Sequence, residues 1–215
     1  MTKLNKRIYS EFNISDPNKY GVCHLHVSGS DKVGEGEHKL FEHIRNNKLE
    51  HLQQNTVIYG LDADLIMLSI NHLPLTKNIF LYRETPHFIK TINADLEPNF
   101  LYFIDIPMLA TAIISDMSDM TDTDENKLNI NTVSNNRRLY DYIFICFFLG
   151  NDFMPHFPSC NIRTGGIFKL LNAYKHIIGN SSNSHIYLTD GDKICWNHLR
   201  KFISFMAAQE LPNLK

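Results

Sequence analysis

Five carboxylates in three short stretches of the chain have the residue types and spacing of a divalent-cation site. Glu35 and Glu37 form an E-x-E pair, each preceded by a glycine, Asp62 and Asp64 form a D-x-D pair, and Asp152 follows a Gly-Asn step. Side chains two residues apart in an extended or turn segment can face the same way. Each pair can therefore offer oxygen atoms to one ion.

Gathering five carboxylates in one place requires a counter-charge, because like charges raise one another's pKa and lose solvation as they pack. Hard ions such as Mg²⁺ or Mn²⁺ suit an all-oxygen site. Two such ions about 4 Å apart can activate a water molecule and stabilise the leaving oxygen of a phosphodiester. The pattern predicts a two-metal phosphodiesterase site, in which Gly34, Gly36 and Gly60 let a substrate phosphate approach the backbone.

Each stretch also has an ordinary structural interpretation. Acidic residues stabilise the first turn of a helix, so E-x-E and D-x-D can be capping features. Asp152 taken singly is a turn residue. The GEGE stretch lacks the G-x-G-x-x-G spacing of a dinucleotide-binding loop. Only the recurrence of carboxylates after three apolar elements favours the metal site, and both interpretations stay open from the pattern alone.

The elements expected around the acids alternate between strands and helices. Alternating apolar residues and compact β-branched runs predict strands, and apolar residues at helical spacing predict helices. Strands are expected over residues 21–27, 56–59 and 78–84, and helices over 38–47 and 65–70. In such βαβ chains successive strands are usually parallel, so the acids would converge at the edge formed by the carboxyl ends of the strands.

The second half of the chain is expected to be mainly helical. Residues 99–114 contain strand-like and helix-like parts that periodicity does not separate, and residues 116–136 are polar and acidic, which predicts an exposed or disordered loop. The apolar run over 142–149 predicts a buried helix that ends in a left-handed cap at Gly150. Beyond Pro158 we expect two amphipathic helices, joined by a polar loop containing Asp190-Gly191.

Composition places the chain among ordinary globular proteins. It has 215 residues, 43% of them hydrophobic and 20% charged, which is enough for one sizeable domain or for one domain and part of a second. The net charge of -2 provides no global basic field, so a polyanionic partner would need a local basic patch or metal ions. The longest apolar run is far below the roughly 20 residues that cross a bilayer, so we expect no membrane span.

Cysteine and histidine usage does not indicate a zinc site. The chain has no CxxC pair and no stretch resembling a signal peptide, so we expect an intracellular location and no structural zinc. Without a second Cys or His at ligand spacing, four histidines are interpreted as ordinary strand and helix residues: His24, His26, His38 and His43.

Three longer stretches around the acids closely resemble the catalytic region of Xrn-type 5′→3′ exoribonucleases, in the order and with roughly the spacing of that family. They are VSGSDKVGEGEHKLFEHIR at 27–45, YGLDADLIMLSI at 59–70 and FICFFLGNDFMPHFPS at 144–159. The resemblance begins at about His24. It continues through NIRTGGIFKLLNAYK and YLTDGDKICWNHLRKFI, which are similar to the start of the family's helical region.

The resemblance implies an α/β fold: a parallel-sheet nuclease core of the flap-endonuclease or PIN-like type, followed by the beginning of a helical region. The core would occupy residues 1–160 in incomplete form, and the helical region 161–215. It also implies that acidic residues hold two Mg²⁺ or Mn²⁺ ions, and that water cleaves the terminal phosphodiester of 5′-monophosphate RNA to release mononucleotides.

The family's ligands can be carried over by matching motif. Glu35 and Glu37 would bind mainly one ion, with Glu37 reaching toward the second. The second ion would be held by Asp62, Asp64 and Asp152.

The chain also departs from the family pattern. Two further acidic ligands, a basic cluster that grips the 5′-phosphate and a base-stacking histidine come, in the family, from segments before the strand that precedes GEGEH. Residues 1–19 contain no recognisable counterpart. We therefore expect a fragment, a degenerate relative, or one product of a split gene whose second polypeptide supplies the rest. Two alternatives are a flap-type DNA nuclease and a non-catalytic RNA-binding or interaction remnant, although the GNDFMPHFP continuation is more similar to the exoribonucleases.

Overall fold

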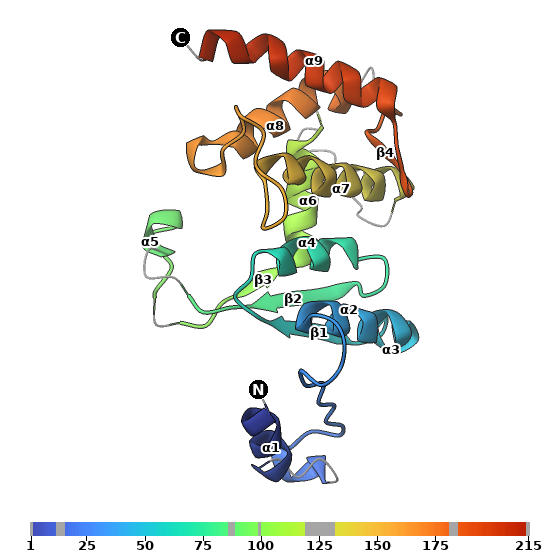
Figure 1. Ribbon diagram of the computed structural model, residues 1–215, viewed down its shortest axis with the longest axis vertical. Coiled ribbons are helices and arrows are strands. Elements are labelled where there is room, and N and C mark those ends of the chain that lie inside the picture. Colours follow the sequence, from blue (N-terminus) through green and yellow to red (C-terminus); the bar gives the residue numbers. More distant parts are fainter. Residues whose placement is uncertain are drawn as a thin grey trace. The chain divides into compact units, whose positions relative to one another are not determined.

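The computed structural model describes residues 2–11, 16–85, 89–98, 100–118, 132–180 and 185–213. The chain divides into two compact units, Met1–Lys48 and Leu49–Lys215 (Figure 1). Among the residues described, no helix combines the length and the apolar character that a membrane crossing needs.

The first unit contains helices joined by irregular chain: α1 (Thr2–Glu11), the short 3-10 helix η1 (Pro17–Tyr20) and α2 (Gly36–Asn46). The helix α2 confirms the prediction for this segment. The strand expected over 21–27 is wrong, because these residues form no strand and most of their side chains are exposed. A strand needs a neighbour to take up its backbone hydrogen bonds, and the described part of this unit contains no other strand.

The second unit begins within α3 (Lys48–His51), which spans the boundary, and continues with a three-stranded sheet. The strand order is β1 (Asn55–Tyr59), β2 (Asn78–Tyr82), β3 (Phe103–Asp105). The strands β1 and β2 are parallel and are connected through α4 (Asp64–Asn71), which confirms the predicted βαβ unit. The strand β3 runs antiparallel to β2, so the sheet is mixed and the expectation of a parallel sheet is only partly correct.

The connection between β2 and β3 accounts for this reversal. A parallel neighbour needs a crossover that packs on the sheet. Here the only described helix of the connection is α5 (Ile89–Ile92), which has four residues and lies away from the strands in Figure 1.

The ambiguous segment 99–114 divides at Asp105. The carboxylate of Asp105 accepts a hydrogen bond from the Met108 amide (2.9 Å) and caps α6 (Ile106–Asp116), which has Pro107 in its first turn. An Asp two residues before a Pro is a helix-start signal that the sequence contained. One face of the sheet, including the buried side chains of Ile58, Ile79 and Leu81, packs against α4 and α6.

The helix expected over the apolar run of residues 142–149 is confirmed by α7 (Val133–Cys146) and the 3-10 turn η3 (Phe147–Leu149). Gly150 has φ 80° and ψ 163°, so the predicted left-handed cap is wrong. The chain turns sharply here, and a Cβ atom at Gly150 would lie 2.6 Å from the His156 backbone nitrogen. Of the loop expected over 116–136, residues 119–131 lie outside the described residues. The prediction is wrong at both described ends, because Asp116 is the last residue of α6 and residues 133–136 form the first turn of α7. Met117, Ser118 and Asn135 are buried there and not exposed.

The remaining elements are the 3-10 turn η4 (Ile162–Thr164), α8 (Gly166–Tyr174), the π-helical turn η5 (Lys175–Gly179), a hairpin of β4 (Thr189–Asp190) and β5 (Lys193–Ile194), and α9 (Trp196–Asn213). The two amphipathic helices are therefore confirmed. The polar loop between them contains a hairpin whose turn includes Gly191 at φ 63°. The helices α8 and α9 pack together over buried residues that include Leu170, Tyr174 and Phe202.

A buried carboxylate, Asp141, connects α7 to α8 and to the hairpin. It is 0% exposed, and its two oxygens accept four hydrogen bonds of 2.6–2.7 Å, from the Tyr174 hydroxyl, the Leu188 amide, and the amide and hydroxyl of Thr189. Burial raises the pKa of Asp141 above its ordinary value, although these hydrogen bonds oppose that rise. Such a satisfied polar network fixes the relative positions of the elements that it joins.

The four cysteines should differ strongly in reactivity. Cys23 is exposed and Cys160 is buried, while burial raises the pKa of the Cys146 thiol to about 11. At pH 8 only about a thousandth of Cys146 would be thiolate, which is the reactive form. We expect iodoacetamide to label Cys23 within minutes and to label Cys146 and Cys160 only after urea is added, as followed by peptide mass spectrometry. Equal labelling of Cys23 and Cys146 in the folded protein would contradict this prediction.

Candidate metal centre

The start of α2 brings together three side chains that can bind a metal ion. The ligand atoms of Glu35, Glu37 and His38 all lie within 4.8 Å of one another, and within the described residues this is the one group of three such donors. Glu35 is the residue before the helix, with extended backbone, and Glu37 lies in the first helical turn. The Glu35 carboxylate is 3.8 Å from His38 Nε2, and both side chains are about two-thirds exposed, at 66% and 68%.

A lysine of the same helix ties down the loop that leads into this group. Lys39 Nζ donates hydrogen bonds to the carbonyl oxygens of Gly29 (3.0 Å) and Lys32 (2.7 Å). Gly34 adopts φ 100°, a conformation that favours glycine. A Cβ atom at Gly36 would meet nothing within 4 Å, so the backbone between the two glutamates is open on that side.

The D-x-D pair lies in the loop between β1 and α4. The Asp62 carboxylate accepts a hydrogen bond from the Asp64 amide (3.2 Å), which satisfies one of the free amides at the start of α4. Arg83, directly after β2, donates to the Leu61 carbonyl (2.8 Å) and so ties this loop to the next strand. Packing explains the glycine at position 60, because a Cβ atom there would overlap the Leu65 side chain. Both aspartates are exposed.

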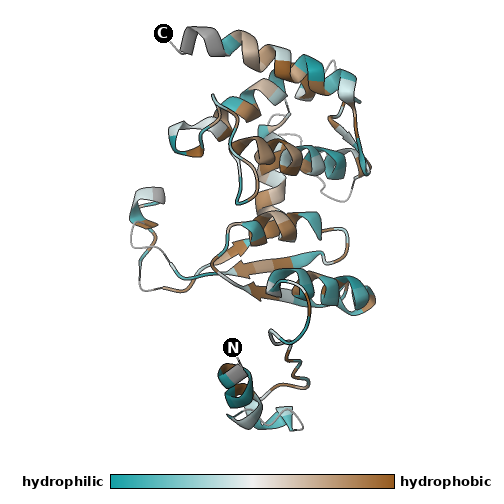
Figure 2. Ribbon diagram, in the orientation of Figure 1, coloured by the Kyte–Doolittle hydropathy of each residue, from teal (hydrophilic) through white to brown (hydrophobic). Residues whose placement is uncertain are grey.

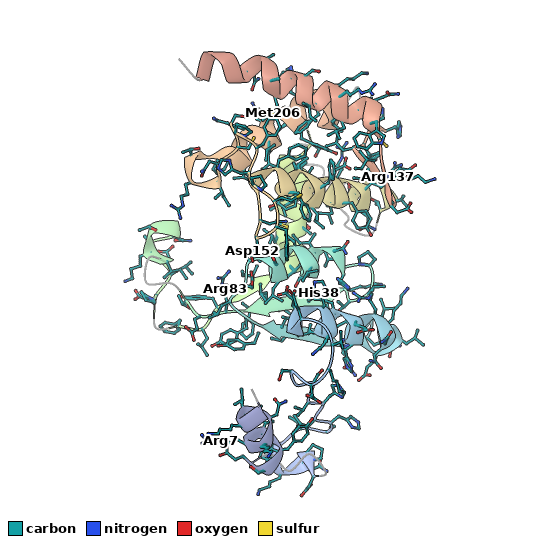
Figure 3. All side chains as sticks on the ribbon, in the orientation of Figure 1. Arg7, His38, Arg83, Arg137, Asp152 and Met206 are labelled. Carbon is teal, nitrogen blue, oxygen red and sulfur yellow. The ribbon has the colours of Figure 1, made fainter. Side chains whose placement is uncertain are left out.

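Asp152 lies in a turn that the side chain of the preceding residue, Asn151, stabilises. The Asn151 side chain accepts hydrogen bonds from the amides of Phe153 (2.9 Å) and Met154 (2.8 Å), and the Asn151 amide donates to the Met154 carbonyl (2.9 Å). Asp152 is exposed in this turn, and Figure 3 labels it. The positioning role of Asn151 was not predicted, although an Asn at the start of a turn is a recognised sequence signal.

The acidic residues do not all follow strands, although the sequence pattern predicted that they would. Only Asp62 and Asp64 follow a strand; the glutamates follow an irregular loop, and Asp152 follows the turn at η3. In the described part of the second unit, no three acidic, His or Cys side chains meet at ligand distance. Shared binding of one ion by Asp62, Asp64 and Asp152 stays a prediction.

His38 belongs to this group of donors, so its interpretation as an ordinary helix residue is incomplete. It lies three residues after Glu35, so the two side chains share one face of the helix start. Its imidazole adds a nitrogen donor to two carboxylates. That spacing was visible in the sequence, because residues three apart are neighbours on a helix. Figure 3 labels His38.

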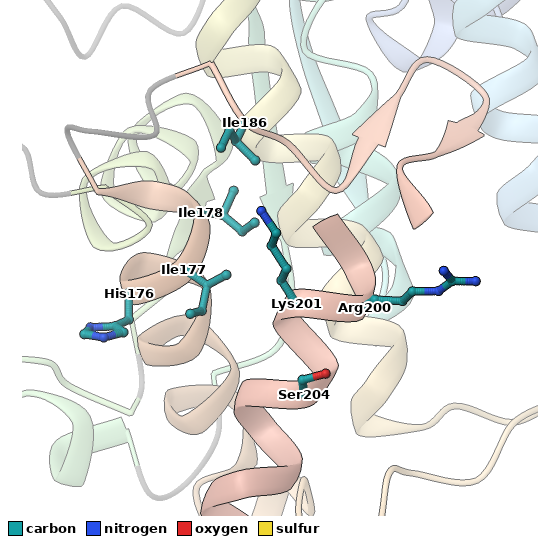
Figure 4. Close-up of a pocket in the computed structure, with 7 residues that line it drawn as sticks. All are labelled: His176, Ile177, Ile178, Ile186, Arg200, Lys201 and Ser204. Carbon is teal, nitrogen blue, oxygen red and sulfur yellow. The ribbon is translucent and has the colours of Figure 1, made fainter. Parts of the chain in front are cut away.

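A cavity of about 570 Å³ lies elsewhere, between η5 and α9. In Figure 4, Lys201 points toward Ile178 and Ile186, whereas Arg200 points away from them. The described residues that line this cavity include no carboxylate, so its chemistry differs from that of the candidate metal centre. Its lining residues are His176, Ile177, Ile178, Ile186, Arg200, Lys201 and Ser204.

The Asp62 loop gives a test that separates capping from ligation. Asparagine also caps helices, so Asp62→Asn should leave the free energy of unfolding nearly unchanged, whereas Asp62→Ala should lower it by about 1 kcal/mol. Both variants should weaken Mn²⁺ binding, because both remove a carboxylate. Urea unfolding and calorimetry measure the two effects. Equal destabilisation by both substitutions would show that the charge of Asp62, and not its hydrogen bond, stabilises the loop.

Two family models match this chain. Residues 1–85 match the XRN 5′-3′ exonuclease N-terminus, and residues 132–211 match the Xrn1 helical domain. The first match contains the E-x-E and D-x-D pairs, and the second contains Asp152. The first match begins at residue 1, so the similarity includes the segment 1–19 in which no counterpart was recognised from the sequence.

Curated proteins of several organisms are also similar. The chain is 31% identical to 5′-3′ exoribonuclease 2 of Arabidopsis thaliana over 86% of its own length and 20% of that protein. It is 29% identical to 5′-3′ exoribonuclease 1 of Saccharomyces cerevisiae over 100% of its length and 14% of that protein. It is 33% identical to 5′-3′ exoribonuclease 2 of Yarrowia lipolytica over 70% of its length and 14% of that protein. The chain thus spans a fifth or less of these relatives.

Proposed function

Because this chain belongs to the Xrn-type 5′→3′ exoribonuclease family, we propose that it supplies part of the active site of a divalent-metal-dependent 5′→3′ exoribonuclease. The observation that carries this proposal is the convergence of Glu35, Glu37 and His38 within 4.8 Å at the start of α2, in the segment similar to the exonuclease N-terminus. The proposed substrate is RNA with a 5′-monophosphate, and the proposed products are mononucleotides.

The donor set fits a divalent ion. Two carboxylates and an imidazole offer oxygen and nitrogen ligands. Because Glu35 and His38 are exposed and Glu37 is half-buried, the group leaves room for water, which Mg²⁺ and Mn²⁺ retain. We propose that Glu35 and Glu37 hold one ion, and that Asp62, Asp64 and Asp152 hold a second. When bound, such a pair of ions activates water and stabilises the leaving oxygen of the phosphodiester.

Other residues of the chain would keep these ligands in place. Lys39 holds the loop before the E-x-E pair, Arg83 holds the loop of the D-x-D pair, and Asn151 shapes the turn of Asp152. The parallel β1-α4-β2 unit supports a nuclease core of the flap-endonuclease or PIN-like type, which is the finer fold that we propose.

We propose that the remaining ligands and the 5′-phosphate pocket come from polypeptide outside these 215 residues, either in the same protein or in a second polypeptide. The acids described above account for five carboxylates, and the family pattern requires more acids and a basic cluster, for which the sequence of this chain shows no counterpart. Curated relatives at least five times longer than the segment that this chain matches provide room for them.

The experiment compares the chain alone with the chain plus the region of the Arabidopsis thaliana relative that precedes their similarity. Both preparations are incubated with 5′-monophosphate and 5′-hydroxyl RNA in Mg²⁺ or Mn²⁺. We expect mononucleotides from the monophosphate RNA in the second preparation. If neither preparation degrades that RNA and Asp62→Ala changes nothing, catalysis is refuted. RNA binding that is indifferent to metal would then favour the non-catalytic remnant, and preference for DNA ends would favour the flap-type nuclease.

A further inference from the structure

A cluster of aromatic rings lies directly before the turn that carries Asp152. The ring of Phe148 packs edge to face against three other rings, with centroid distances of 5.8 Å to Phe144, 5.9 Å to Phe157 and 6.2 Å to Phe202. Edge-to-face pairs at such distances attract one another beyond the burial of their area. These four side chains are here called the ring cluster.

The ring cluster joins segments that are separate in the sequence. They are α7, η3, the chain that leaves the Asp152 turn, and α9, which contribute Phe144, Phe148, Phe157 and Phe202 in that order. In Figure 2, hydrophobic residues occupy the second half of α7, where the apolar run leads into the cluster. The helix α9 therefore contacts the Asp152 turn at its base.

The backbone closes the turn at the same place. The Phe157 amide donates a hydrogen bond to the Phe148 carbonyl (2.7 Å) and so closes a loop. Within this loop the Asn151 amide donates to the Met154 carbonyl (2.9 Å). Because Asp152 lies inside the closed loop, the place of its carboxylate depends on the base that Phe148 and Phe157 form.

The ring that α9 contributes is fixed by its surroundings. The Phe202 side chain is 0% exposed, and α9 packs on both α8 and η5. Protein interiors are close-packed, so a change at one buried side chain displaces its neighbours. Phe202 can therefore set the position of Phe148, although it is distant in the sequence and cannot bind a metal ion.

The start of α8 holds the chain that leaves the Asp152 turn. A Cβ atom at Gly166 would lie 2.5 Å from the carbonyl carbon of Cys160, so the helix begins directly against this backbone. Lys169 Nζ of the same helix donates to the Ser159 carbonyl (3.4 Å). One arm of the turn is thus held by α9 and the other by α8.

We propose that Phe202 is a positioning residue for Asp152, and that it acts through the ring cluster. This inference rests on the proposed function, in which Asp152 is a metal ligand. The helices α8 and α9 are then part of the support of the metal centre, because they keep one ligand in the place that an ion requires. Replacing a group behind a metal ligand commonly lowers metal affinity by about 10- to 100-fold.

The first test follows the turn itself, in the full chain and without metal. Hydrogen exchange is measured by NMR at the amides of Asn151, Phe153 and Met154, which donate hydrogen bonds within the turn. Phe202→Leu keeps the position apolar and removes the ring. We expect it to speed exchange at these amides by about threefold to tenfold, which corresponds to the loss of an aromatic pair.

Leu170→Ala is the matched control for a purely structural effect. Leu170 is buried on α8 at 1% exposure and lies outside the ring cluster. Both variants should lower the melting temperature, but only Phe202→Leu should speed exchange in the turn. Phe148→Leu, which replaces the central and only half-buried ring, is the second variant and should speed exchange as Phe202→Leu does.

The second test measures Mn²⁺ affinity by calorimetry, at a temperature where circular dichroism shows every variant folded. We expect Phe202→Leu to lower the affinity about tenfold in the wild-type chain. In the Asp152→Asn chain the same substitution should cause no further loss, because the ligand that it positions is already gone. Leu170→Ala should leave the affinity unchanged in both chains.

The inference is overturned if the turn amides exchange at the wild-type rate in Phe202→Leu, or equally fast in Leu170→Ala. It is also overturned if Phe202→Leu lowers Mn²⁺ affinity further in the Asp152→Asn chain, since Phe202 would then act elsewhere. Failure of the proposed function has a different signature. If Asp152→Asn itself leaves Mn²⁺ affinity unchanged, Asp152 is not a ligand, whereas faster exchange in Phe202→Leu still shows that α9 holds the turn.

Discussion

Replacement of Asp141 by asparagine is expected to lower the free energy of unfolding of the second unit by about 2–4 kcal/mol. Each carboxylate oxygen accepts from one backbone amide, Leu188 on one side and Thr189 on the other. Whichever oxygen becomes the NH₂ group, one buried backbone amide then faces another donor. The Tyr174 and Thr189 hydroxyls can reverse their direction, but the amides cannot.

Urea unfolding followed by circular dichroism measures this change. The matched control is Asp190→Asn in the same hairpin, because Asp190 forms an exposed ion pair with Arg137 (3.0 Å) and its removal should cost less than about 1 kcal/mol. A penalty for Asp141→Asn no larger than that of the control would show that the buried network does not hold α7 to its neighbours.

The effect of Asp141 should also depend on pH. Burial raises its pKa in the folded state, so the folded protein binds this proton more tightly than the unfolded chain does. The resulting stabilisation is complete below the unfolded pKa of about 3.9 and is lost as the pH rises through the folded pKa. The difference in stability between wild type and Asp141→Asn should therefore shrink from pH 4 to pH 7. A difference that grows over this interval would mean that the hydrogen bonds outweigh burial.

Replacement of Glu37 by glutamine is expected to reduce the rate of RNA degradation by the reconstituted nuclease by about 100-fold or more. Glutamine keeps the size of the side chain and its place in the first turn of α2, but it removes the negative charge that a divalent ion requires. Mn²⁺ affinity measured by calorimetry should fall along with the rate. Glu42→Gln is the control, because Glu42 is an exposed glutamate of the same helix outside the cluster.

If Glu37 is a metal ligand, Glu37→Gln must lower both the rate of RNA degradation and the affinity for Mn²⁺. If the variant loses activity while it binds Mn²⁺ as tightly as wild type, Glu37 acts on the substrate and not as a ligand. If Glu37→Gln and Glu42→Gln behave alike in both measurements, the E-x-E pair is only a helix-capping feature. That result would remove the principal support for a metal centre in this chain.

The local sequence was sufficient where neighbouring residues decide the structure. The period of apolar residues predicted α2, α4 and α8, the continuous apolar run before Gly150 predicted the end of α7, and the β-branched run predicted β1, because these patterns act within one element. The βαβ connection made β1 and β2 parallel, as expected. The E-x-E spacing with a histidine three residues after Glu35 also lies within one helical turn, so this part of the site was readable from the sequence.

The tertiary structure decided what depends on partners distant in the chain. The segment 21–27 has the alternation of a strand but forms none, because alternation fixes side-chain direction and only a neighbouring strand supplies hydrogen bonds. No short stretch of sequence predicts the direction of β3 or the burial of Asp141, whose carboxylate accepts a hydrogen bond from Thr189. The same holds for the exposure of Tyr59. Sequence spacing determined which residues can share a turn, and packing between distant segments determined which surfaces are covered and which remain open.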